Sequence, residues 1–144
     1  MVYIGKSLSI KKITRKESEM KESKNVLIVE DEILIALNLK RDLERYGYEV
    51  RDIIASGEKA IRCMESDCPL IVLLDIRLAG VMTGLEVARK IYKQHGRLGI
   101  IFMTGYITPE IKEEALSLDP LAFLEKPITA RDILRIIKPE SLSK

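Results

Sequence analysis

The sequence of 144 residues predicts an α/β fold, in which helices cover both faces of a doubly wound parallel sheet. Three short apolar runs predict buried strands, because they are rich in β-branched residues and lack polar alternation: Val26–Val29, Leu70–Leu74 and Ile100–Met103. Helical patterns separate these runs, so that strand and helix alternate five times from Asn25 onward. Right-handed crossovers then bring the carboxyl ends of all the strands to one edge of the sheet.

Weaker patterns place the remaining elements. They are expected as strands at 48–55 and 122–124, and as helices at 33–46, 57–67 and 85–94, with two more that begin after Thr108 and Thr129. Thr83 and Glu86 have the spacing of a capping box, which predicts a helix start between them. Pro109 and Glu110 favour the first turn of the helix that follows Thr108.

The composition excludes several classes of protein. A chain with 47% hydrophobic and 32% charged residues is typical of a globular domain and not of disorder. The 24 basic and 22 acidic residues nearly cancel, which argues against nucleic-acid binding through bulk charge. No apolar run approaches the roughly 20 residues of a membrane span. Cys63 and Cys68 form no disulfide framework or zinc motif, so we expect a cytoplasmic protein, and we expect the single histidine, His95, on the exposed surface.

Charge divides the chain into two parts. Residues 1–24 contain seven basic and three acidic residues without a clear apolar period, and we expect them to form a flexible or helical extension. Residues 25–144 contain 17 basic and 19 acidic residues and form the predicted domain. The mild basicity of the whole chain therefore belongs to the extension and not to the domain.

Polar residues follow four of the predicted strands: Glu30, Asp31, Asp75, Thr104 and Lys126. Open parallel sheets bind ligands beyond these strand ends, so we expect the side chains to converge. Clustered carboxylates repel one another, and a hard divalent cation relieves that repulsion. A lysine and a hydroxyl can then contact phosphoryl oxygens while a carboxylate acts as the nucleophile. The pattern predicts phosphoryl transfer to a carboxylate.

Four ordered motifs carry a resemblance to a known family: residues 29–32 (Val-Glu-Asp-Glu), 73–76 (Leu-Leu-Asp-Ile), 102–105 (Phe-Met-Thr-Gly) and 123–127 (Phe-Leu-Glu-Lys-Pro). From Asn25 to Lys138 the chain resembles a receiver domain of two-component response regulators. The resemblance implies a flavodoxin-like sheet of five strands in the order 2-1-3-4-5, with five helices. It also implies a signalling domain and not an enzyme.

The resemblance further implies a role for each matching residue. Asp75 would be the phosphoacceptor, Lys126 would pair with the acyl phosphate, and Thr104 and Phe123 would form the switch. Mg²⁺, or Mn²⁺, would be held by Asp31, Asp75 and the backbone carbonyl of Arg77, with Glu30 acting through water. The remaining implied features are a cis peptide before Pro127 and room for phosphate at Gly105.

Several positions depart from the family pattern. The loop after Asp75 is one residue longer than usual, with Ala79 where proline is common and Thr83 where aspartate is common. Phe123 replaces a frequent tyrosine, so the switch ring lacks a hydroxyl. Arg77 and Tyr106 occupy positions that modulate dephosphorylation in the family, and we expect an effect on acyl-phosphate lifetime without a predicted sign.

The implied phosphodonor is a histidine kinase or a phosphotransfer protein. The implied output surface comprises the fourth helix, fifth strand and fifth helix, and would contact a downstream protein or a second copy of the chain, with no direct DNA binding. Two alternatives remain open: an interaction module that works without phosphorylation, and a phosphatase of the haloacid dehalogenase type. The latter needs a second carboxylate two residues after Asp75, where Arg77 stands. The chain would be a stand-alone regulator or a piece of a hybrid kinase.

Overall fold

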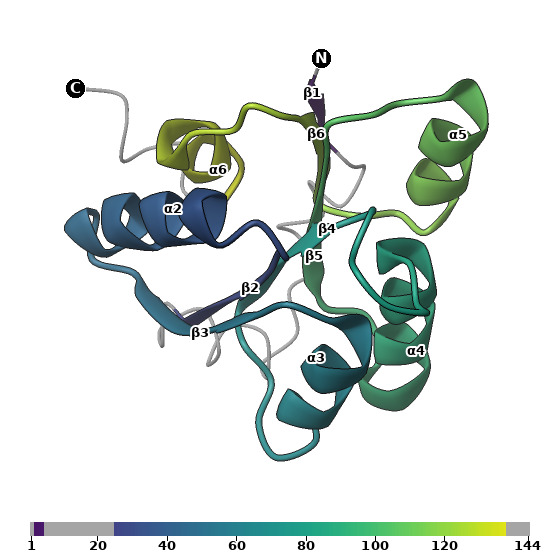
Figure 1. Ribbon diagram of the computed structural model, residues 1–144, viewed down its shortest axis with the longest axis horizontal. Coiled ribbons are helices and arrows are strands. Elements are labelled where there is room, and N and C mark those ends of the chain that lie inside the picture. Colours follow the sequence, from purple (N-terminus) through teal and green to yellow (C-terminus); the bar gives the residue numbers. More distant parts are fainter. Residues whose placement is uncertain (1, 5–24, 138–144) are drawn as a thin grey trace.

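A computed structural model describes residues 2–4 and 25–137 of the chain (Figure 1). From residue 25 onward, strands and helices alternate as predicted. In chain order they are β2 (Asn25–Val29), α2 (Ile33–Arg45), β3 (Glu49–Ile54), α3 (Gly57–Cys63), β4 (Ile71–Asp75), α4 (Gly84–His95), β5 (Gly99–Thr104), α5 (Pro109–Ser117), β6 (Ala122–Glu125) and α6 (Ala130–Ile137).

One sheet joins all the described strands in the order β1-β6-β5-β4-β2-β3. Strands β2 to β6 run parallel to one another. Since β2 is the first of the five expected strands, their arrangement confirms the predicted order 2-1-3-4-5. The sheet nevertheless has six strands and not five. The additional strand, β1 (Val2–Ile4), pairs antiparallel with β6 at the edge of the sheet. Three residues are too few to show a strand period, so the sequence did not predict it.

The predicted extension of residues 1–24 is described only in part. Val2–Ile4 form an extended strand, while residues 5–24 and 138–144 lie outside the described residues. Within the described ranges, no helix combines the length and the apolar character that crossing a membrane requires.

Helices cover both faces of the sheet, with α2 and α6 on one face and α3, α4 and α5 on the other (Figure 1). The side chains of the central strands alternate between two apolar clusters: Ile28 and Leu73 pack toward α2 and α6, whereas Leu27 and Leu74 pack against α3, α4 and α5. All five residues of β4 are buried. A strand buried on both faces needs apolar residues at every position, which explains the unbroken runs in the sequence.

The capping of α4 differs from that of α2, and the difference affects the carboxyl edge. The predicted capping box of α4 is present, since Glu86 N donates to Thr83 Oγ1 (3.2 Å) and Thr83 N donates to Glu86 Oε1 (3.1 Å). In contrast, Glu32 at the start of α2 makes no side-chain cap hydrogen bond. The acidic residues between β2 and α2 are therefore not occupied in capping that helix.

Two local predictions were wrong. Helix α3 ends at Cys63 and not near residue 67, because the Arg51 guanidinium takes up the carbonyl groups of Cys63 (3.0 Å) and Asp67 (2.9 Å). His95 is half-buried and not exposed, and its Nδ1 lies 3.4 Å from Cys68 Sγ. The end of α4 and the loop before β4 meet at the same end of the sheet, a contact that sequence separation conceals.

Candidate functional site

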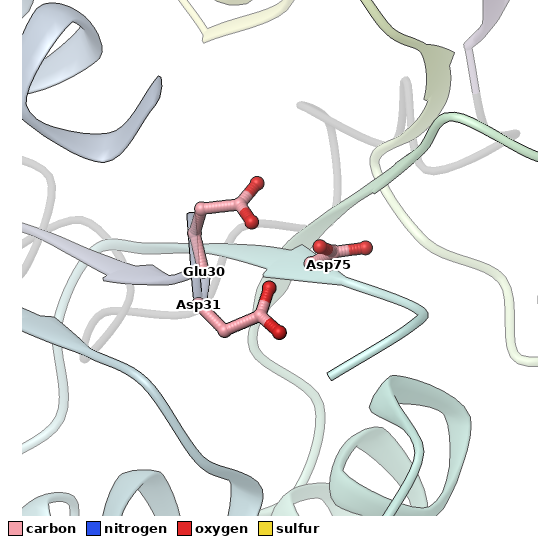
Figure 2. Close-up of side chains that lie close together, drawn as sticks. All are labelled: Glu30, Asp31 and Asp75. Carbon is pink, nitrogen blue, oxygen red and sulfur yellow. The ribbon is translucent and has the colours of Figure 1, made fainter. Parts of the chain in front are cut away.

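The carboxyl ends of β2 and β4 bring three carboxylates together. Glu30 and Asp31 follow β2, Asp75 ends β4, and Figure 2 shows their side chains directed into one shared space. One oxygen from each residue can be chosen so that all three lie within 4.8 Å of one another. Glu30 and Asp75 are buried whereas Asp31 is exposed, so the cluster opens to solvent on the side of Asp31.

Lys126, which follows β6, supplies the positive charge that faces this cluster. Its Nζ lies 2.6 Å from Glu30 Oε1 and 3.0 Å from Asp75 Oδ2. Glu32 Oε1 is farther away, at 3.7 Å. The Lys126 side chain is only 13% exposed, so solvent screens its two short ion pairs weakly.

A backbone amide donates a hydrogen bond to one oxygen of each of the three carboxylates. Glu32 N donates to Glu30 Oε2 (3.1 Å), and Arg77 N donates to Asp75 Oδ1 (3.0 Å). The third carboxylate, Asp31, accepts from Ala79 N (3.1 Å), although 48 residues separate the two in sequence. Each acid is thus oriented by a backbone amide, and Glu30 and Asp75 are held by Lys126 as well.

Burial and charge shift the ionisation of this group. Burial raises the pKa of Glu30 to about 7, and the nearby Asp75 carboxylate adds to the increase, while hydrogen bonds from Lys126 and from the Glu32 amide oppose it. For Lys126, burial alone would lower the pKa, but the hydrogen bonds and charges of Glu30 and Asp75 outweigh it and raise the pKa. The lysine therefore stays charged at neutral pH, and the acids hold more negative charge than one ammonium neutralises.

Such a donor set fits a hard divalent cation. Carboxylate oxygens from two or three residues, open to solvent on one side, match Mg²⁺, which uses one or two carboxylates and keeps several waters. Mn²⁺ prefers the same oxygen donors. The excess negative charge around Glu30 and Asp75 gives the physical reason for a cation to enter.

Thr104 and Phe123 lie on neighbouring strands beside the cluster. The Thr104 hydroxyl is buried and donates to the Tyr106 carbonyl (2.9 Å), while Tyr106 N donates back to it (3.2 Å). The Thr104 hydroxyl is thus engaged by its own loop and not by the carboxylates. Phe123 is 1% exposed and stands opposite Phe102 in the pairing of β5 with β6. Both residues are adjacent to the site without being part of the charged group.

Sequence reasoning assigned no specific role to two contributors to this edge. Glu32 approaches Lys126. The sequence alone cannot distinguish an acidic residue that pairs with a distant lysine from one that caps the helix it precedes. Ala79 contributes only its backbone amide, so its side chain carries no signal at all. The Lys126–Pro127 peptide bond is cis.

The loop after Asp75 closes on itself before α4 begins. Gly84 N donates to the Ile76 carbonyl (2.8 Å), so that residues 77–83 project from a narrow base. A Cβ atom at position 84 would lie 2.1 Å from the Asp75 carbonyl oxygen. Only glycine permits this approach, which places the start of α4 directly against the strand end that carries Asp75.

Replacing Lys126 by methionine removes the counter-charge while keeping the length of the side chain. We expect K126M to lower the free energy of unfolding by about 3 kcal/mol at pH 8 without divalent cations, since Glu30 and Asp75 are then buried without a partner. Urea titration followed by circular dichroism measures this change.

The matched control is K93M, which removes an exposed lysine of α4 and should change stability by less than about 0.5 kcal/mol. Adding E30Q to K126M should restore part of the loss, because one buried charge disappears. Equal stability of K126M and K93M would contradict the proposed ionic constraint.

Comparison with known proteins identifies the family. The family model of the response regulator receiver domain matches residues 26–138. The positive alginate biosynthesis regulatory protein of Pseudomonas aeruginosa is 37% identical over 119 residues, covering 81% of this chain and 47% of that protein. The alkaline phosphatase synthesis transcriptional regulatory protein PhoP of Bacillus subtilis is 32% identical over 117 residues, covering 81% and 48%. The chain thus spans about half the length of these curated relatives.

Solved structures agree with the sequence relatives. A CheY-like response regulator receiver domain from Methanospirillum hungatei is 33% identical with a TM-score of 0.73, and the match covers 81% of this chain and 91% of that one. The receiver domain of a modulated diguanylate cyclase from Desulfovibrio desulfuricans is 35% identical with a TM-score of 0.72, covering 83% and 98%. The chain belongs to the response regulator receiver domains of two-component signalling systems.

Proposed function

We propose that Asp75 accepts a phosphoryl group from the phosphohistidine of a histidine kinase or a phosphotransfer protein. The observation that carries this proposal is the placement of the Asp75 carboxylate, which lies between the Lys126 ammonium and the Asp31 carboxylate at the end of β4. A carboxylate oxygen of Asp75 attacks phosphorus, and a P–O bond forms as the P–N bond to the donor imidazole breaks. The electron pair of that bond leaves with the imidazole nitrogen, and the product is an acyl phosphate.

The residues around Asp75 bind and neutralise the transferred group. Asp31, Asp75 and the backbone carbonyl of Arg77 would hold Mg²⁺ or Mn²⁺, with Glu30 acting through a water molecule. The cation supplies positive charge to the phosphoryl oxygens when it is bound. Lys126 already points at an Asp75 oxygen, and it supplies a second positive charge to the same oxygens.

The signal leaves the site through Thr104 and Phe123. The Thr104 hydroxyl exchanges its contacts with Tyr106 for a hydrogen bond to the phosphoryl group, and the β5–α5 loop moves with it. Phe123 then changes its packing within β6, which alters the face formed by α5, β6 and α6. This is a local charge event that biases a two-state element.

Receiver domains interact with histidine kinases and with downstream effectors, and both kinds of partner are proposed here. The curated relatives are about twice as long as the matched region, so the output activity resides outside a receiver of this size in those proteins. For this chain we propose a cytoplasmic signalling role in which the α5-β6-α6 face contacts a protein and does not itself bind DNA.

Incubation with acetyl phosphate and MgCl₂ should add one phosphate to the protein, as measured by intact-mass spectrometry. D75N should add none, because its amide is no nucleophile. D67N is the control: Asp67 is exposed and lies before β4, at the opposite end of the sheet, so this variant should be labelled like the wild type. An unmodified wild type, or a labelled D75N, would sink the proposal.

Removing the Asp31 carboxylate should abolish the response to metal without unfolding the protein, since this side chain is exposed and its hydrogen bond comes from the Ala79 amide. Saturating MgCl₂ should raise the Tm of the wild type by about 5–10 °C and leave that of D31N unchanged. E32Q is the matched control, because it removes the adjacent carboxylate, and it should keep the full shift. Equal shifts in D31N and the wild type would exclude Asp31 as a ligand.

Arg77 and Tyr106 contact each other beside the same edge. The Arg77 guanidinium lies 5.3 Å from the centroid of the Tyr106 ring, and each residue is tied by its backbone to a site residue, Arg77 to Asp75 and Tyr106 to Thr104. We propose that this stacked pair shields the acyl phosphate from water. The pair thereby lengthens the lifetime of the phosphorylated state.

Breaking the stacked pair should therefore speed dephosphorylation. We expect Y106A and R77A each to shorten the acyl-phosphate half-life roughly three- to tenfold, consistent with the loss of about 1 kcal/mol, and the double variant to be no faster. Intact mass followed over time after removal of the phosphodonor measures the decay. Y46A, which removes another exposed tyrosine, should match the wild type. Unchanged or longer half-lives would contradict the shielding role.

A further inference from the structure

The two outer positions of the parallel sheet differ in how they resist pairing with other chains. β3 lies at one side, and three of its six residues are charged: Glu49, Arg51 and Asp52. Charged residues on an edge strand oppose the docking of a further strand. β6 lies at the other side, and its residues 122–124 are Ala-Phe-Leu. Without another element, the outer edge of β6 would present unpaired backbone amide and carbonyl groups, with no charged side chain along residues 122–124.

β1 occupies the β6 edge. The register sets Val2, Tyr3 and Ile4 opposite Leu124, Phe123 and Ala122. The strand therefore pairs with the three apolar positions and stops before Glu125. Amide groups along a strand point alternately to its two sides, so β5 satisfies one set on β6, and β1 satisfies part of the other. Figure 1 shows β1 on the outer side of β6, in the gap between α5 and α6.

The orientation of β1 shows which other strand this edge accepts. β1 runs antiparallel to β6. The β6 strand of a second copy, related by a two-fold axis, would approach in the same antiparallel orientation and offer the same unpaired backbone groups over residues 122–124. A second copy of this chain thus fits the edge that β1 now covers, without help from a different kind of protein.

The connection between β1 and β2 allows β1 to leave the edge. Three strands separate them in the sheet, which corresponds to about 19 Å at about 4.8 Å per step. Because β1 runs antiparallel to β6, it ends at the side of the sheet where β2 begins. Residues 5–24 join the two strands and would span roughly 65 Å if extended at about 3.3 Å per residue. The parallel sheet therefore places no geometric restraint on release of β1.

We propose that Val2–Ile4 form a covering strand that protects the edge of β6 against pairing with a second copy of the chain. Because the covering strand has only three residues, its pairing with β6 is short and can be displaced. At the other side of the sheet, the charged residues of β3 always oppose pairing with a further strand. The covering strand controls access to the edge that lies between α5 and α6. This inference goes beyond the proposed function and does not depend on phosphorylation of Asp75.

Two deletions of equal size test the proposal in the full chain without phosphodonor. One removes residues 2–4 and the other removes residues 7–9, Ser-Leu-Ser; each takes away three uncharged residues, and the second keeps the covering strand. Hydrogen exchange of the peptide that covers 121–126 should be roughly tenfold faster after deletion of 2–4, and exchange in β4 should be unchanged. Sedimentation velocity should show self-association at least tenfold tighter than for the wild type. The deletion of 7–9 should behave as the wild type in both measurements.

Each alternative outcome overturns a stated part of the inference. Unchanged exchange in β6 after deletion of residues 2–4 would show that the covering strand does not pair in solution. Faster exchange with unchanged self-association would show that the covering strand does not protect against a second copy. If both deletions increased self-association equally, the length of the amino-terminal segment and not β1 would be responsible. None of these results bears on phosphate incorporation at Asp75, so the two proposals fail separately.

Discussion

A single ammonium group holds together the charged edge on which this domain depends. Glu30 and Asp75 are both nearly inaccessible to solvent, and Lys126 Nζ lies within 3.0 Å of an oxygen of each. Two buried carboxylates that face one another repel strongly, and burial together with the Asp75 charge raises the pKa of Glu30 to about 7 despite the opposing hydrogen bond from Lys126. The lysine makes this arrangement tolerable but leaves net negative charge. This remaining negative charge favours the binding of a cation, and a bound cation would in turn favour a phosphoryl group at the site.

The fold provides the positions that this balance requires. The lysine follows β6, one acid ends β4 and the other follows β2, so the register of four parallel strands (β2, β4, β5 and β6) determines the distances between them. The central strands are fixed by apolar side chains on both faces, and the polar groups are confined to the strand ends. Because α2 begins without a side-chain cap, the acids after β2 remain available to the site. The buried sheet stabilises the domain, and the polar side chains of the site lie at the ends of its strands.

Sequence reasoning succeeded where a residue's type and its position in a strand carry the information. The apolar runs of β2, β4 and β5 identified the sheet, and the side chains that follow them identified the charged edge. It failed where contacts are made by backbone atoms or by few residues. The amide of Ala79 leaves no trace in a side chain, three residues of β1 show no period, and the early end of α3 depends on the distant Arg51. The His95–Cys68 contact likewise joins the end of α4 to the loop before β4, whose proximity only the folded chain reveals.

The narrow base of the loop after Asp75 separates two kinds of evolutionary change. The hydrogen bond from Gly84 to Ile76 fixes the start of α4 against the strand, whatever lies between them. Arg77, Ala79 and Thr83 make contacts at this base, so only the side chains of residues 80–82 at the tip can be exchanged without disturbing them. The tip of the loop can thus vary in sequence while the geometry of the carboxylates beneath it stays the same.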